Sequence, residues 1–217
     1  MYKFIRFLFA LSLTAIFGCA YASSVDLKNL IKVTNDNNPK CVIYYHYKND
    51  LYCSPTASGQ DKPDPQIVTY EKQKIIFDNR PWQTAWGKQT NNITTVEYVP
   101  AGDNVEDWYE LITSQFIPGI QKKTTPLQFS EEILYSLNRS GFKPEVTYFE
   151  KSPNRVLFEF RITSPKNMAQ DELQLVTKGE KGFYVLHYVI KEPDMGMSNR
   201  NKWLENLKKS SPLEQNE

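Results

Sequence analysis

The feature that most constrains the fold is a run of four strand-like stretches between residues 145 and 191. In residues 156–163 (VLFEFRIT), large apolar side chains occupy every second position, which is typical of a half-buried antiparallel strand. Residues 145–150 precede this stretch across the turn sequence KSPNR, and residues 172–178 and 182–191 flank the hairpin signal GEKG. Because short turns join antiparallel neighbours, the sequence predicts an antiparallel sheet here.

Upstream of this run, the pattern predicts two more strands and one helix. Residues 67–78 and 93–100 are rich in β-branched and aromatic side chains, and the Trp-bearing residues 79–92 between them are expected to form a loop. A helix is predicted from Asp103 to Pro118, with Glu106 in a capping-box position. Five large apolar side chains would share one face of it: Val105, Trp108, Tyr109, Ile112 and Phe116.

Two further helices complete the predicted order. Thr125 and Pro126 are typical of an N-cap and a first helical position, and Gly141 supplies the stop. A last helix is predicted after Ser198, in SNRNKWLENLKK. Runs of strands next to runs of helices predict an α+β main domain over residues 67–209, an antiparallel β-sheet packed by helices.

The N-terminal residues have the layout of a secretory signal peptide. Lys3 and Arg6 precede an uninterrupted apolar run from Phe7 to Phe17, which is too short to cross a bilayer. Small residues at 20 and 22 favour cleavage after position 22, so residues 1–22 are predicted to be removed. The alternative is a lipoprotein anchored through Cys19, which bulky Phe17 disfavours.

The two cysteines that remain after either route predict a disulfide between Cys41 and Cys53, since a secreted chain reaches an oxidising compartment. Residues 41–53 also contain strand-like stretches around the turn signal KND, and a short helix is predicted before them. We therefore expect residues 23–53 to form a helix and a small disulfide-closed hairpin. The proline-rich residues 54–66 are predicted to be a linker, and residues 210–217 a disordered tail.

Charge and composition exclude several classes of partner. Without Lys3 and Arg6, the 26 basic residues fall to 24 against 25 acidic ones, a net charge near −1. Such a balance gives no electrostatic footprint for nucleic acid. No later segment is long and apolar enough to predict a membrane span. With 40% hydrophobic residues, the chain can bury a sizeable core.

A search for catalytic motifs returns no catalytic residue, metal site or cofactor site. The chain has only two histidines, and neither phosphate-binding loops nor zinc spacings are present. His187 shares strand parity with apolar neighbours and is interpreted as a histidine within the sheet, and His46 lies in the aromatic hairpin.

Carboxylates leave one enzymatic alternative open. Glu97 in VEYVP, with Glu106 and Asp107 at the predicted helix start, could form the two-carboxylate site of a glycosidase. A charge on a strand face and acidic residues favoured by the helix dipole explain the same three positions without catalysis.

The stretch RPWQTAWGK is the candidate binding segment. Trp82 and Trp86, together with Arg80 and Lys88, could form an aromatic patch for sugar, peptide or another protein. The alternative is that both indoles fill the core or cover a sheet edge.

The sequences EYVPAGDNVEDWYELITSQF and GFYVLHYVIKEPD, read with the leader, resemble a group of small uncharacterised exported proteins of Gram-negative bacteria. The group resembled includes proteins of Legionella, some of which are released by type II secretion. The resemblance implies no activity and no site residues. We therefore expect an exported, non-enzymatic binding or accessory protein with a protein or polymer ligand, located in the periplasm or outside the cell. The alternatives are a small secreted hydrolase and a structural component of a secretion or envelope assembly.

Overall fold

The computed structural model describes residues 28, 30–34, 40–48, 50–55 and 65–213. The predicted signal peptide with Cys19, most of the predicted linker and the last four residues of the predicted tail lie outside these ranges. No helix among the described residues is long and apolar enough to cross a membrane.

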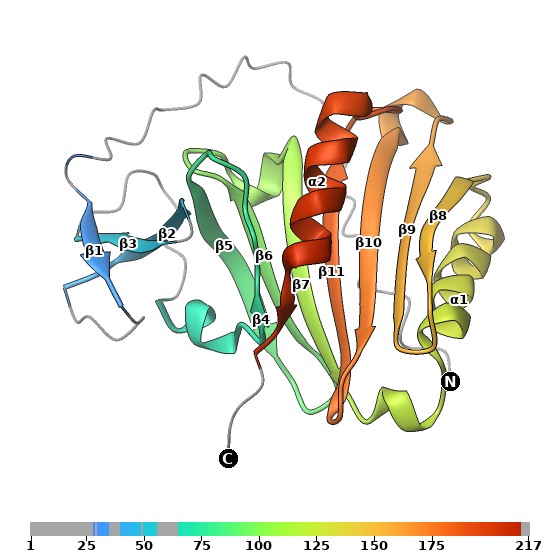
Figure 1. Cartoon of the computed structure of the whole chain (residues 1–217). Coiled ribbons are helices and arrows are strands. Elements are labelled where there is room, and N and C mark those ends of the chain that lie inside the picture. Colours follow the sequence, from blue (N-terminus) through green and yellow to red (C-terminus); the bar gives the residue numbers. More distant parts are fainter. Residues whose placement is uncertain (1–27, 29, 35–39, 49, 56–64, 214–217) are drawn as a thin grey trace.

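A single antiparallel sheet dominates the described part of the chain (Figure 1). Its ten strands follow the order β1-β3-β2-β5-β6-β7-β11-β10-β9-β8. The strands are β1 (Ile31–Val33), β2 (Ile43–Tyr47), β3 (Asp50–Ser54), β5 (Trp82–Gln89), β6 (Thr94–Pro100), β7 (Glu110–Pro118), β8 (Glu145–Lys151), β9 (Arg155–Ile162), β10 (Gln170–Lys178) and β11 (Gly182–Ile190). A short ladder of β4 (Gln73–Lys74) and β12 (Ser211–Pro212) lies apart from this sheet.

The remaining regular elements are helical. The described residues form two α-helices, α1 (Pro126–Arg139) and α2 (Met197–Lys209). Short 3₁₀ turns occur at η3 (Pro65–Tyr70), η4 (Val105–Asp107), η5 (Ile120–Lys122) and η6 (Lys166–Met168). The strands from 145 to 191, both α-helices and the hairpin β2–β3 confirm the corresponding predictions.

The prediction of an α+β domain with helices packed over the sheet needs correction. The molecule is mainly β, and its two helices do not form a layer over the sheet. Figure 1 shows α2 in front of the sheet and α1 beside β8 at one end. Each helix contributes a few side chains to a local apolar cluster, α2 through Trp203 and α1 through Leu137.

The helix predicted from Asp103 to Pro118 is wrong. Residues 105–107 form only the turn η4, and β7 runs from Glu110 to Pro118 in the middle of the sheet. Leu111 and Ile117 point to one face of β7 and Ile112 to the other, and all three are buried. A strand buried on both faces has no simple alternation, so its apolar residues imitated a helical stripe.

Three other local predictions are also corrected. The Trp-bearing segment is not a loop, because β5 covers most of it and pairs with β6. Of residues 67–78, predicted to be a strand, only Gln73 and Lys74 are in a strand. The predicted helix before the hairpin is contradicted where the chain is described, since residues 31–33 form β1.

The disulfide between Cys41 and Cys53 is confirmed, with Cα atoms 5.5 Å apart. Cys53 lies within β3 and Cys41 lies two residues before β2 begins. Strand β2 also pairs with β5, through Tyr45 opposite Gln83. The hairpin therefore extends the main sheet, while the predicted domain limits at residues 54–66 stay a prediction.

Strand β5 contains an irregularity that decides where its aromatic side chains lie. Its pairing with β6 shifts register between Thr84 and Trp86, so that one extra residue, Ala85, is accommodated as a bulge. Trp82 belongs to the apolar cluster beneath α2, whereas Trp86 lies opposite Glu97 on the other face of the sheet.

Candidate functional site

The four residues predicted to bind a ligand do not form one patch. Trp82 is 0% exposed and packs against Trp203, so for this indole the alternative that it fills the core holds and the exposed patch does not. Its Nε1–H donates to Asp78 at 3.0 Å, which satisfies the polar atom of the buried ring. Trp86 is half-buried and Lys88 is exposed. A binding role for these residues stays a prediction.

Arg80 belongs to an ion-pair network that anchors α2. Its guanidinium donates to Asp78 and to both carboxylate oxygens of Glu110, at 2.7 to 2.9 Å. Lys202 of α2 also donates to Asp78, at 3.0 Å. Burial would raise the pKa of Asp78, but the hydrogen bonds from Arg80, Trp82 and Lys202 lower it to about 2. These groups are mutually satisfied and hold the fold together.

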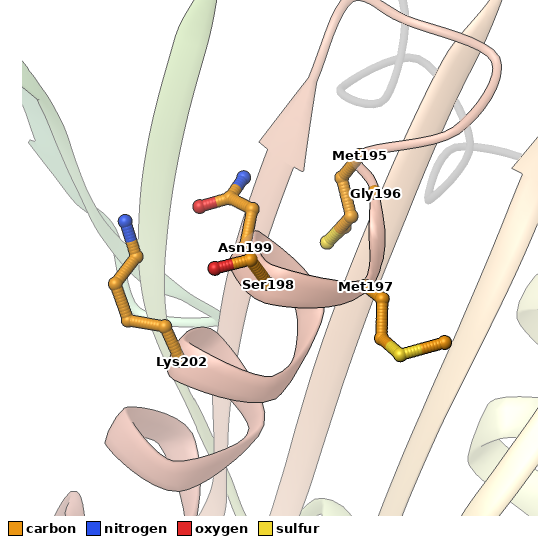
Figure 2. A pocket seen from close by; sticks show the side chains of 6 residues that line it. All are labelled: Met195, Gly196, Met197, Ser198, Asn199 and Lys202. Carbon is orange, nitrogen blue, oxygen red and sulfur yellow. The ribbon is translucent and has the colours of Figure 1, made fainter.

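A hollow of about 370 Å³ lies at the start of α2, beside this network (Figure 2). Figure 2 shows Asn199 and Lys202 on one side of the helix and Met197 turned away from them. Asn199 already donates to the Tyr188 hydroxyl at 2.7 Å, and Lys202 is bound to Asp78. The polar groups that line the hollow therefore serve the packing of α2.

The remaining predicted residues are distributed over the molecule. His46 is half-buried and packs against Phe77 and Tyr98, and desolvation of the ring lowers its pKa to about 4, so it is neutral near pH 7. Glu106 and Asp107 are exposed on η4. Trp86, Glu97 and His187 are brought together on the face of the sheet opposite α2, and Glu106 lies close enough to Glu97 to repel it.

These three side chains belong to a line of residues that crosses five strands, which we name the polar row. Successive cross-strand partners place Trp86 beside Glu97, Glu97 beside Thr113, Thr113 beside His187 and His187 beside Gln174. Cross-strand partners point to the same face of a sheet. With strands about 4.8 Å apart, the polar row spans about 19 Å. Trp86, Glu97 and Thr113 are half-buried, and His187 and Gln174 are buried.

The imidazole in the polar row is held by hydrogen bonds on both sides. Its Nδ1 lies 2.7 Å from Glu172 Oε1, and its Nε2 lies 3.3 Å from Gln115 Oε1. Gln174 Nε2 donates to the same oxygen of Glu172 at 2.6 Å. Gln170 Nε2 donates to the other oxygen of Glu172 at 3.2 Å, so Glu172 is hydrogen-bonded to three side chains and fixes the orientation of His187 and Gln174 at the inner end of the row.

Two acceptors in the polar row have no donor. The carboxyl of Glu97 makes no hydrogen bond or ion pair with any described residue. Burial raises its pKa to about 7, the repulsion from Glu106 adds to this, and the attraction of His187 opposes it. The Oε1 atom of Gln174, a residue that is 0% exposed, also lacks a hydrogen-bond partner. A fully buried acceptor such as Gln174 Oε1 destabilises a fold unless something else supplies a donor, whereas the half-buried carboxyl of Glu97 is partly open to solvent.

Sequence reasoning missed Glu172, Gln115, Gln174 and Thr113. A signal was present, since polar residues recur at every second position within strands whose other residues are strongly apolar. These polar residues form a row only if their strands are neighbours in the sheet. The sequence does not show this, because β10 and β11 come far later in the chain than β6. Within the described ranges, no group of three or more histidine, cysteine or acidic residues is arranged to hold a metal ion.

Fold and site together define a mainly antiparallel β protein with a polar row on one sheet face. A protein-family profile matches residues 70–217, and the chain belongs to that family, an uncharacterised bacterial family. The match covers the main sheet from β5 onward and includes the whole polar row. No curated protein matches the chain.

Proposed function

We propose that this protein is an exported, non-enzymatic binding protein that holds its ligand along the polar row. It would act in the periplasm or outside the cell, and release by type II secretion is the route that the resemblance implies. The leader-like N-terminus supports export, and the disulfide between Cys41 and Cys53 is compatible with an oxidising compartment.

The observation that carries the binding proposal is the unpartnered carboxyl of Glu97. A glutamine at this position would avoid the cost of burying a charge, whereas the carboxyl is stable there only when it is protonated or meets a cation or donor. Groups that destabilise the fold without a partner in the protein are typical of functional sites. The half-buried indole of Trp86 beside it adds a flat apolar contact surface.

A small secreted hydrolase is the second candidate, and one observation favours it. A carboxyl with a pKa of about 7 can act as a general acid near neutral pH, and Glu97 has this property, with the fixed His187 two strands away. Catalysis would require Glu97→Gln to abolish turnover of a polymer while leaving its binding intact. Binding alone would require the same substitution to weaken affinity with no turnover in either form.

Export is tested by the intact mass of the chain recovered from the periplasm and the culture medium. We expect a chain that starts at residue 23 and weighs two hydrogens less than its reduced form. A chain that keeps residues 1–22, or free thiols at Cys41 and Cys53, would contradict export. An acylated Cys19 would instead establish the lipoprotein alternative.

The loss of folding free energy caused by the charged carboxylate of Glu97 is tested by the pH dependence of stability. An acid whose pKa is raised by folding contributes stability below its ordinary pKa and loses it as the pH rises through the raised value. Between about pH 4.5 and 7, the wild-type chain should therefore lose stability relative to Glu97→Gln. At pH 8 we expect the variant to be more stable by about 1 to 2 kcal/mol, after allowance for solvent screening.

The measurement is urea denaturation of both chains at pH 4 and pH 8, with Glu106→Gln as the matched control. Glu106 is exposed, so its substitution should change stability by less than about 0.5 kcal/mol at either pH. Equal stability of wild type and Glu97→Gln at pH 8 would show that the carboxyl has no cost, and it would remove the support for a binding role.

A further inference from the structure

Positively charged side chains gather at one end of the sheet, which we name the basic end. It is formed where β5, β7, β8 and β10 end and by the turns that follow them, at the lower side of Figure 1. The C-terminus of α2 joins it, because Arg155 on β9 donates to the backbone oxygen of Lys208 at 3.0 Å. Its basic residues are Lys88, Lys122, Lys123, Lys151, Arg155, Lys178, Lys181, Lys208 and Lys209.

Acidic side chains are fewer at the basic end. Those of the same strand ends and turns, together with the last turns of α2, are Glu150, Glu180 and Glu205. Even when Glu131 and Glu132 in the second turn of α1 are added, the nine basic residues leave a net charge near +4. The chain without residues 1–22 has a net charge near −1, so folding concentrates positive charge that the overall balance conceals.

Most of these positive charges are open to solvent and uncompensated. All of the nine basic residues except Arg155 are exposed. The ion pairs at this end involve Arg155 and Lys209. Four of the lysines make no ion pair with any described residue: Lys122, Lys123, Lys178 and Lys208. Because like charges repel one another, the approach of an anionic partner stabilises such a cluster.

The opposite end of the sheet differs, since its charges are mixed and paired. Arg161 binds Glu145 and Asp194 there, and Arg200 also binds Asp194. An anionic partner would meet carboxylates as well as cations at this end. The charge distribution therefore selects the basic end as the contact surface.

The layout of the basic end fits a plane of anionic groups better than a single anionic strand. From β5 to β8 it extends over six strand spacings, about 29 Å. Lys208 and Lys209 add a second direction, because they belong to α2, which lies in front of the sheet in Figure 1. A linear polyanion follows one line, whereas a flat layer of headgroups meets positive charges spread in both directions.

The turns at the basic end carry no large apolar side chain that could insert into a bilayer. Their sequences are TNN at residues 90–92, SPN at residues 152–154 and GEK at residues 179–181. Contact with a membrane through these turns is therefore electrostatic and stays at the level of the headgroups.

We propose that the basic end docks this protein reversibly onto membrane surfaces that are rich in anionic phospholipids. The strands then stand upright on the membrane, and the end with mixed charge points away from it. Clusters of lysine and arginine are attracted to anionic headgroups in this way, within about one Debye length of the surface. The docking does not use the polar row and does not rest on the proposed function.

The first test is co-sedimentation of the exported chain, starting at residue 23, with large vesicles at low salt. We expect it to bind vesicles made of equal parts phosphatidylglycerol and phosphatidylcholine, and not to bind vesicles of phosphatidylcholine alone. In about 0.5 M salt the Debye length falls to about 4 Å, so the chain should be released.

The second test compares two double variants that lose the same charge. Lys122→Gln combined with Lys178→Gln should weaken binding to the mixed vesicles about 25-fold, or about fivefold for each lysine. The matched control, Lys143→Gln combined with Lys166→Gln, removes two exposed lysines near the other end of the sheet. It should change binding less than about twofold. Since all four side chains are exposed, both variants should keep the wild-type stability.

Four outcomes overturn the proposal. These are no binding to the mixed vesicles, equal binding to phosphatidylcholine vesicles, equal loss in the two double variants, or tighter binding to soluble heparin than to the vesicles. The last would assign the basic end to an anionic polymer. Glu97→Gln should bind the vesicles as wild type does, so failure of the docking and failure of the proposed function are observed separately.

Discussion

Replacing Trp203 with alanine is expected to lower the free energy of unfolding by about 3 to 5 kcal/mol. The indole is 1% exposed and stacks on Tyr188, with ring centroids 4.1 Å apart. It also meets Trp82 edge to face, with centroids 5.5 Å apart. Removing the ring leaves a cavity between α2 and the sheet, and α2 loses its largest apolar contact.

Guanidinium denaturation of wild type, Trp203→Ala and Trp203→Phe measures this contribution. The indole Nε1 of Trp203 is buried without a hydrogen-bond partner, so phenylalanine loses little beyond ring size and should cost less than about 2 kcal/mol. Glu205→Ala, on the exposed side of the same helix, should change stability by less than about 0.5 kcal/mol. A loss below 1 kcal/mol for Trp203→Ala would mean that α2 contributes little to the core.

The second large effect is expected for Arg200→Met. Arg200 donates to Glu159, Asp171 and Asp194, and the first two are 4% and 0% exposed. Removing the cation leaves two buried carboxyl groups without compensation, which typically costs about 3 to 5 kcal/mol. The matched control is Arg161→Met, whose ion pairs with Glu145 and Asp194 are largely exposed and should contribute less than about 1 kcal/mol.

This loss should depend on pH in a defined direction. Burial, together with the charge of Glu159, raises the pKa of Asp171 to about 7 even in the presence of Arg200. Because protonation relieves the uncompensated charge, the destabilisation by Arg200→Met should be largest above pH 7 and should shrink toward pH 4. Chemical denaturation across this range measures it, and a pH-independent loss would show that Arg200 acts through packing alone.

Elements whose pattern is local were predictable from the sequence. Helix α1 has the predicted N-cap at Thr125 and the predicted proline at its start, and the structure adds a capping box between Thr125 and Gln128. Gly141 follows the helix at a φ of +92°, a conformation that glycine adopts without strain. The hairpins β8–β9 and β10–β11 also follow turn signals and strand alternation that lie within a few residues of each other.

Strand β7 was not predictable by the same reasoning because it is a central strand with both faces buried, Ile112 in one apolar cluster and Leu111 and Ile117 in clusters on the other face. The candidate site could not be predicted from the sequence for a related reason. Glu97, Trp86 and His187 each attracted attention singly, but their adjacency depends on pairing between β6, β7 and β11. Trp82 and Arg80 were assigned to a surface patch because the sequence does not reveal Asp78 and Glu110 as their partners.

The bulge at Ala85 has a consequence for how this protein can change over time. Trp82 and Trp86 are four positions apart, and uninterrupted alternation would place both on one side of β5. The extra residue separates them, one into the core under α2 and the other beside Glu97. Deleting that one residue would turn every later side chain of β5 to the opposite face of the sheet. Natural variation in this family should therefore tolerate substitutions in β5 far better than changes in its length.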